Sequence, residues 1–195
     1  QKVPINEHHP LVAQSPYSAS KIAADKIIES YYHSFQLPVV TARPFNTFGP
    51  RQTARAVIPT IASQLLSQCE ELRLGSTTPT RDFVYVTDTA AALMLLAKCQ
   101  ELEGKAVNIG TGNEYSISDI AHSLMRVIGH DCTIVSDDDR IRPEQSEVQR
   151  LISDSELLRK FTGWEPVIEF SEGIKLTVEW LSKNMDKFDP SNYSR

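Results

Sequence analysis

The sequence lacks a long hydrophobic run. Its longest purely apolar stretch, residues 90–97, is far shorter than the roughly 20 residues that a membrane-spanning helix needs. The first residues, QKVPINEHHP, lack the basic-then-apolar pattern of a secretory signal, and they do not begin with Met. We therefore expect no membrane span, and we expect that this end of the chain is processed, trimmed or truncated.

Cysteine is also scarce. The three cysteines, Cys69, Cys99 and Cys132, stand far apart, and no pair has the C-x-x-C spacing of a metal or redox motif. An odd count argues against a disulfide framework, so a reducing cytoplasm is the simplest expectation. His8 and His9 are adjacent and point apart, and no other ligand spacing accompanies them. The sequence therefore predicts no metal site.

The sequence has fewer basic residues than acidic ones. The formal net charge is -5 over 195 residues, which argues against a broad surface for nucleic acid or for an anionic membrane. Local basic residues remain able to bind a small anion. The composition, 41% hydrophobic and 23% charged, is that of a globular protein of one or two domains.

The glycines do not form a dinucleotide fingerprint. No G-x-G-x-x-G follows a candidate strand near the N-terminus. A GTG run at residues 110–112 follows an apolar segment but has only two glycines. We interpret it as a tight turn rather than a phosphate cradle.

Candidate strands alternate with candidate helices, which predicts an α/β fold with parallel pairing. Ser15 and Pro16 suit the N-cap and first position of a helix. Asp88 is a candidate cap for a later helix, and residues 45–54 look like a loop. Strands are expected over PVVTARP, ELRLGS, RDFVYV, KAVNIG and CTIVS.

The spacing of Tyr17 and Lys21 has chemical meaning. Residues four apart on a helix share a face, and a neighbouring ammonium favours the phenolate form of a tyrosine. Such a pair can accept a proton from a substrate hydroxyl while hydride leaves the same carbon. On this motif alone, a pair of surface side chains is the simpler interpretation.

Five motifs in order add to that pair: SPYSASKIAAD, PVVTARPFNTFGPRQ, RDFVYVTDTAAA, VNIGTG and RPEQSE. This set resembles the extended short-chain dehydrogenase/reductase family, the NAD-dependent nucleotide-sugar epimerases and dehydratases, over nearly the whole chain. Within the family it looks closest to nucleotide-sugar 4,6-dehydratases of the legionaminic-acid-pathway type, because of the run RIRPEQSEVQRLISD.

The resemblance implies roles for the cofactor side of a site. Tyr17 would be the catalytic base, and Lys21 would bind the nicotinamide ribose and tune Tyr17. Pro44 would approach the nicotinamide ring of NAD. Phe48 stands where family members more often carry Tyr, which removes one local hydroxyl.

It also implies roles for the substrate side. Asn46 would reach the diphosphate of a nucleotide-diphosphate sugar. Arg81 and Arg142 would pair with the same diphosphate. Glu144 would hold the ribose hydroxyls. Simpler alternatives exist for three of these residues.

Those alternatives need no ligand. Asn46 would tie down a turn, and Arg81 would pair with Asp82 or Asp88. Arg142 would join an ion cluster with the acids at 137–139.

The fold that the resemblance implies is the C-terminal part of a Rossmann-like parallel sheet plus a smaller mixed substrate-binding lobe. Residues 1–50 would be the remnant of the dinucleotide-binding domain, and 51–195 mainly the nucleotide-sugar lobe, interwoven with returning Rossmann strands. The glycine-rich βαβ half, the family's Ser or Thr and the dehydratase acid would all precede residue 1. The helix with Tyr17 would mediate a homo-oligomer.

The implied reaction is 4,6-dehydration: oxidation at C4 by NAD, loss of water across C5 and C6, and reduction at C6. A 4-epimerase, a non-catalytic nucleotide-sugar-binding module and a partner-binding domain with relic motifs are the alternatives. We expect the 195-residue chain alone to be inactive.

Overall fold

The structure is a computed structural model, and it describes residues 2–141, 143 and 146–187. Its helices are α1 (Pro16–Phe35), α2 (Val57–Leu66), α3 (Val86–Leu96), α4 (Ile117–Ile128), α5 (Glu156–Thr162) and α6 (Phe170–Ser182). Its strands are β1 (Thr41–Pro44), β2 (Asn46–Phe48), β3 (Glu71–Leu74), β4 (Thr80–Arg81), β5 (Phe83–Tyr85), β6 (Ala106–Ile109), β7 (Tyr115–Ser116), β8 (Thr133–Ser136) and β9 (Arg150–Leu151). The predicted α/β class is confirmed. No helix within the described ranges is long and apolar enough to cross a membrane.

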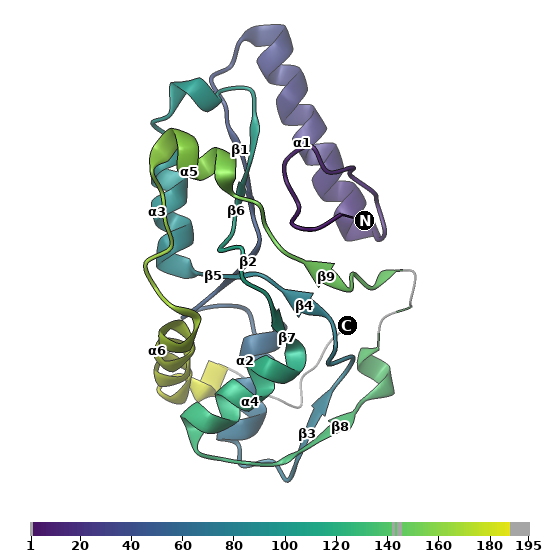
Figure 1. Ribbon diagram of the computed structural model, residues 1–195. Helices are drawn as coiled ribbons and strands as arrows, with labels where there is room; N and C mark the ends of the chain where they lie inside the picture. Colours follow the sequence, from purple (N-terminus) through teal and green to yellow (C-terminus); the bar gives the residue numbers. More distant parts are fainter. Residues whose placement is uncertain (1, 142, 144–145, 188–195) are drawn as a thin grey trace.

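Parallel pairing dominates the strands, as expected. β1 pairs with β6, β2 with β5, and β3 with β8, all parallel. β4 pairs parallel with β9 and antiparallel with β7. α3 and α5 lie on one side of the β1–β6 pair and α1 lies on the other (Figure 1).

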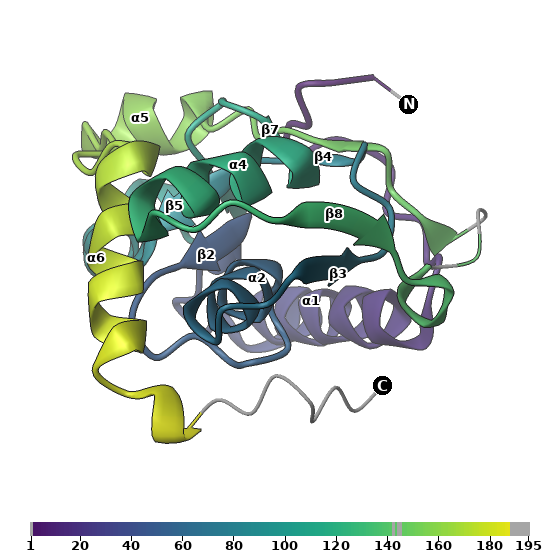
Figure 2. The same ribbon diagram turned by 90° about the horizontal axis from the view of Figure 1, so that it is seen from below.

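Two hydrophobic cores hold these elements. The larger core packs α2, α4 and α6 against β2, β3 and β5, and Figure 2 shows α6 next to α2 and α4 with its axis crossing theirs. The smaller core joins α3, α5 and β6, with Trp164 and Leu158 buried in it. Burial of apolar area in both cores supplies the main driving force for folding. The division of the chain at residue 50 stays a prediction.

Helix α1 begins as its sequence predicts. The Ser15 hydroxyl accepts from the Ser18 amide at 3.1 Å, the Ser18 hydroxyl accepts from the Ser15 amide at 2.9 Å, and Pro16 opens the first turn. These bonds satisfy two amides that a helix start leaves without partners. None of the 20 residues of α1 is buried. An ion pair of 2.8 Å from Arg43 to Asp25 ties the helix to β1.

The predicted strand RDFVYV is wrong as one element. It divides into β4 and β5, which belong to different sheets, and Asp82 lies between them. The predicted loop at 45–54 is partly wrong as well, because Asn46–Phe48 forms β2 beside β5. The reason is a long-range one: the divided segment gives β2 a partner that local sequence does not reveal.

Asp82 is fully buried and fastens three segments together. Its carboxylate accepts from the Thr111 amide at 3.0 Å, the Thr111 hydroxyl at 2.7 Å, the Gly112 amide at 2.9 Å and the Ser153 amide at 3.1 Å. Buried carboxylates are tolerated when such donors surround them. The Thr111 and Gly112 amides of the GTG run therefore face a protein carboxylate, which agrees with a tight turn.

Asp88 does not cap α3. It lies inside the first turn, and its carboxylate accepts from the amides of Val167 at 3.1 Å and Ile168 at 3.0 Å. The Trp164 indole also donates to the Asp88 carbonyl at 3.0 Å. Asp88 thus fixes the segment between α5 and α6, and the predicted cap is wrong.

Candidate functional site

A cavity of about 380 Å³ opens beside the ends of β3 and β4. Its size falls within the range of small-molecule pockets. Asn46 and Arg81, predicted from separate motifs, both line it, together with Gln52, Arg55, Arg140 and Glu147. The fold therefore brings two of the predicted substrate residues into one cavity.

Arg81 is held in place by the loop that precedes β9. Its Nη1 donates to the Val148 carbonyl at 2.6 Å and to the Thr80 carbonyl at 2.9 Å, and its Nη2 donates to Glu147 Oε1 at 2.8 Å. The side chains of Arg81 and Glu147 are both largely buried. The alternative pairing with Asp82 or Asp88 is wrong, because those two carboxylates accept backbone amides elsewhere.

The wall of the cavity is rich in guanidinium groups. Arg55, Arg81 and Arg140 line it, and Glu147 is the acidic group among its lining residues within the described part of the chain. Asp137 accepts from Arg140 Nε at 2.9 Å and so fixes that side chain. Planar guanidinium forks match phosphate oxygens in geometry and charge. This wall can bind an anion although the whole chain is acidic.

Two amide side chains add polar contacts. Asn46 Nδ2 donates to the Asp82 carbonyl at 3.0 Å, so it both secures β2 and lines the cavity. Gln52 Nε2 donates to the Thr47 carbonyl at 2.8 Å. Among the described side chains, Gln52 Oε1 is the one buried polar atom without a hydrogen-bond partner. Such atoms are rare, and a ligand hydroxyl or N–H in the cavity would satisfy it.

Tyr17 and Lys21 lie together but apart from this cavity. Lys21 Nζ sits 5.5 Å from the centroid of the Tyr17 ring, so the two share a face of α1 as predicted. Tyr17 is 72% exposed, and neither residue lines the cavity of Asn46 and Arg81. Their catalytic roles stay predictions.

The remaining predicted residues fall into two groups. Pro44 ends β1 and lines a separate hollow of about 220 Å³ with Phe45 and Asn108. Arg142 and Glu144 lie outside the described residues. Their roles also stay predictions.

Sequence reasoning missed four residues of the cavity. Glu147 is the last residue of the RPEQSE motif, and Arg140 lies two residues before it, so the motif was the available signal, but it did not show which acid faces Arg81. Gln52 comes from the segment expected to be a loop, and Arg55 directly follows that segment. Gln52 ends the quoted motif PVVTARPFNTFGPRQ, but the motif assigned it no role, and Arg55 lies outside every quoted motif.

The described residues fit one end of NAD only. Tyr17, Lys21 and Pro44 have the chemistry to face a nicotinamide riboside: a phenol, an ammonium and an apolar ring. The GTG turn does not fit a pyrophosphate, because its Thr111 and Gly112 amides donate to Asp82 and its Gly110 amide donates to the Ser155 hydroxyl. A Cβ added at Gly110 would lie 2.2 Å from Ser153 Cβ, so protein already fills that space.

Comparison with protein families gives one match over most of the chain. The family described as GDP-mannose 4,6 dehydratase matches residues 1–177. A putative UDP-glucose 4-epimerase of Methanocaldococcus jannaschii is 33% identical over 186 residues, which cover 93% of this chain and 58% of that protein. The human dTDP-D-glucose 4,6-dehydratase is 32% identical over 182 residues, covering 92% of this chain and 51% of the enzyme.

Solved structures agree with these relatives. The crystal structure of dTDP-glucose 4,6-dehydratase from Bacillus anthracis in complex with NAD superposes with a TM-score of 0.82 and 31% identity. The match covers 95% of this chain and 58% of that one. The chain thus spans about half the length of the proteins that it matches.

Proposed function

Since this chain belongs to the GDP-mannose 4,6 dehydratase family of extended short-chain dehydrogenases/reductases, we propose that it forms the nucleotide-sugar-binding half of an NAD-dependent 4,6-dehydratase. The observation that carries this proposal is the cavity with Asn46, Arg81 and Arg140 in its wall. Its arginines supply what a diphosphate requires, and its amides suit sugar or base hydroxyls and N–H groups.

The proposal divides the chemistry between two surfaces. Arg81 and Arg140 bind the diphosphate, and the Glu147 carboxylate accepts from ribose hydroxyls close to where the motif placed Glu144. NAD, when bound, supplies the acceptor for hydride from the sugar's C4. Tyr17 takes the proton of the C4 hydroxyl, and Lys21, whose Nζ lies 5.5 Å from the centroid of the Tyr17 ring, binds the ribose of the nicotinamide beside it.

A 4-epimerase is the second candidate, favoured by the putative UDP-glucose 4-epimerase at 33% identity. Both reactions begin with removal of hydride and a proton at C4, so Tyr17 and Lys21 serve them equally. Product analysis separates the two, because dehydration releases water and leaves a 4-keto-6-deoxy sugar. Epimerisation returns the hydroxyl with inverted configuration.

Binding of nucleotide sugars tests the proposed cavity directly. We expect calorimetry to show that the chain binds UDP-, dTDP- or GDP-hexose, and that Arg81→Lys weakens the preferred ligand roughly 10–100-fold, since it removes the planar fork but keeps the charge. Arg73→Lys is the matched control, because Arg73 is exposed on β3 and pairs with Glu71.

Equal affinity in Arg81→Lys and Arg73→Lys would place the diphosphate elsewhere. Circular dichroism and thermal unfolding of both variants show whether the fold is kept. This check matters because Arg81 also holds the loop at Val148.

We also propose that the protein is a homo-oligomer through α1, in a reducing cytoplasm that keeps its cysteines as thiols. Ile27, Tyr31 and Phe35 follow one another at four-residue spacing on α1, and all three are exposed, Phe35 to 71%. The Tyr31 and Phe35 rings lie 5.5 Å apart and form one apolar stripe. An exposed stripe of this kind is typical of an interface.

Light scattering is expected to show a dimer or larger assembly at micromolar concentration. Tyr31→Glu should raise its dissociation constant at least about 100-fold, because a charge would be buried at the centre of the interface. Val167→Glu is the control, since Val167 is 80% exposed and lies outside α1. A monomeric wild-type chain would contradict the proposal.

A further inference from the structure

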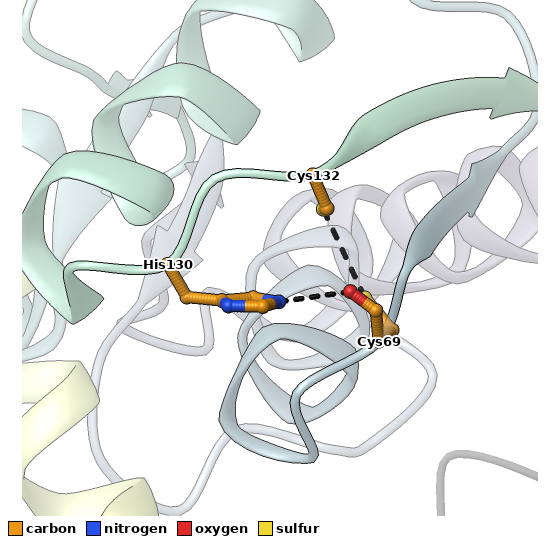
Figure 3. A group of neighbouring side chains, drawn as sticks. All are labelled: Cys69, His130 and Cys132. Carbon is orange, nitrogen blue, oxygen red and sulfur yellow. Dashed lines mark hydrogen bonds between the residues drawn. The ribbon is translucent and has the colours of Figure 1, made fainter.

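Three metal-ligand side chains that stand far apart in sequence meet at one end of the β3–β8 pair. Cys69 precedes β3, and His130 and Cys132 precede β8. The parallel register that pairs Glu71 with Thr133 brings the segments before both strands side by side. Figure 3 shows the three side chains turned toward a common centre.

The distances within this cluster are short. Cys69 Sγ and Cys132 Sγ are 3.9 Å apart, and both sulfurs and one ring nitrogen of His130 lie within 4.8 Å of one another. All three residues are half-buried, so an ion can enter and still be partly screened from water.

We propose that Cys69, His130 and Cys132 form a site for one zinc-type transition-metal ion, with water as the fourth ligand. Two thiolates and an imidazole are the donors that zinc prefers. With zinc–sulfur bonds of about 2.3 Å, a tetrahedral site places its two sulfurs about 3.8 Å apart. The sulfurs of Cys69 and Cys132 already have nearly this separation, so the imidazole is the ligand that must close in.

The histidine ring points one nitrogen at the cysteines. A carbonyl oxygen can only accept, so the 2.8 Å hydrogen bond between His130 Nε2 and the Cys69 carbonyl requires hydrogen on Nε2. Figure 3 shows Nε2 as the ring nitrogen on the side of the cysteines. A metal bound through Nε2 would replace this hydrogen bond, and Nδ1, on the far side of the ring, would then carry the proton.

Burial, and then the hydrogen bond with Cys132, raise the pKa of the Cys69 thiol to about 11. A metal ion bound here would have to displace that proton, because a coordinating thiol loses its proton to the metal.

The position of the cluster indicates a structural role. Leu74, at the other end of β3, lines the arginine-rich cavity, so the two sites lie at opposite ends of the strand, and the five steps from Cys69 to Leu74 span roughly 16 Å at about 3.3 Å per residue. A metal here would fasten the α2–β3 connection to the α4–β8 connection. The sequence predicted no metal site because no ligand spacing along the chain indicated one. This proposal departs from that prediction, because the three ligands come together only in the fold.

Zinc binding tests the site without any catalytic assay. Chelator-treated chain is titrated with Zn²⁺ against a competing chelator, and bound metal is counted by elemental analysis. We expect one zinc per chain in the wild type and in Cys99→Ser, whose thiol lies near Glu101 instead. Cys69→Ser and Cys132→Ser should each lose at least about 100-fold in affinity, more than a change outside the ligands produces.

Cobalt gives a second measurement that needs no variant. Co²⁺ added to the unmodified chain should produce the visible bands of tetrahedral coordination and a near-ultraviolet thiolate-to-cobalt band. Octahedral cobalt spectra, or zinc affinity equal in Cys69→Ser and Cys99→Ser, would overturn the proposal. So would a Cys69–Cys132 disulfide in chain incubated with Zn²⁺, because zinc-bound thiolates would be kept reduced.

Discussion

Tyr17→Phe is expected to lower turnover of a nucleotide sugar by roughly 10²–10⁴-fold, the usual contribution of a positioned general base. The measurement uses a protein that joins this chain to the dinucleotide-binding half of its family, with NAD and the hexose nucleotide that binds best. Phe keeps the ring beside Lys21 and removes only the hydroxyl, so the helix surface is unchanged.

The same substitution should leave binding almost unchanged. Tyr17 does not line the cavity of Asn46 and Arg81, so the dissociation constant of the nucleotide sugar should stay within about twofold. Tyr31→Phe, on the same helix and also exposed, is the matched control and should keep full activity. Turnover of Tyr17→Phe equal to that control would remove Tyr17 from the reaction.

Local signals in the sequence predicted the helices and the strands β1, β3, β6 and β8. The start of α1 follows from Ser15, Ser18 and Pro16, and the hydrogen bonds of that cap are all within four residues. Gly129 likewise ends α4 in the left-handed conformation that glycine adopts readily. Such features need no tertiary information, so a single sequence is sufficient for them.

Contacts between residues far apart in the chain could not be predicted from the sequence. Asp82 divides an apparent strand because its carboxylate meets donors about 30 and 70 residues later in the chain. Asn46 and Arg81 were found through family motifs, whereas Glu147 became visible only when the fold placed it against Arg81. The Cys69–His130–Cys132 cluster depends on β3–β8 register in the same way.

Asp82→Ala is expected to lower the free energy of unfolding by about 3–5 kcal/mol, a large share of the stability of a small protein. The substitution leaves the amides of Thr111, Gly112 and Ser153 without their acceptor. A buried amide without a partner retains its full desolvation cost, and each of these hydrogen bonds goes to a charged group. Urea unfolding followed by circular dichroism measures the loss.

Asp82→Asn tests whether stability depends on the two acceptor oxygens of Asp82 or only on the size and shape of its side chain. Asn keeps one oxygen but turns an NH₂ toward donors that need an acceptor, so it should lose nearly as much stability as Ala despite its size. Asp186→Ala is the control, because Asp186 is exposed and its removal should change stability by less than about 0.5 kcal/mol. If Asp82→Asn were as stable as the wild type, packing alone would hold the GTG turn, and the carboxylate would have no part in joining Thr111 and Ser153 to β4.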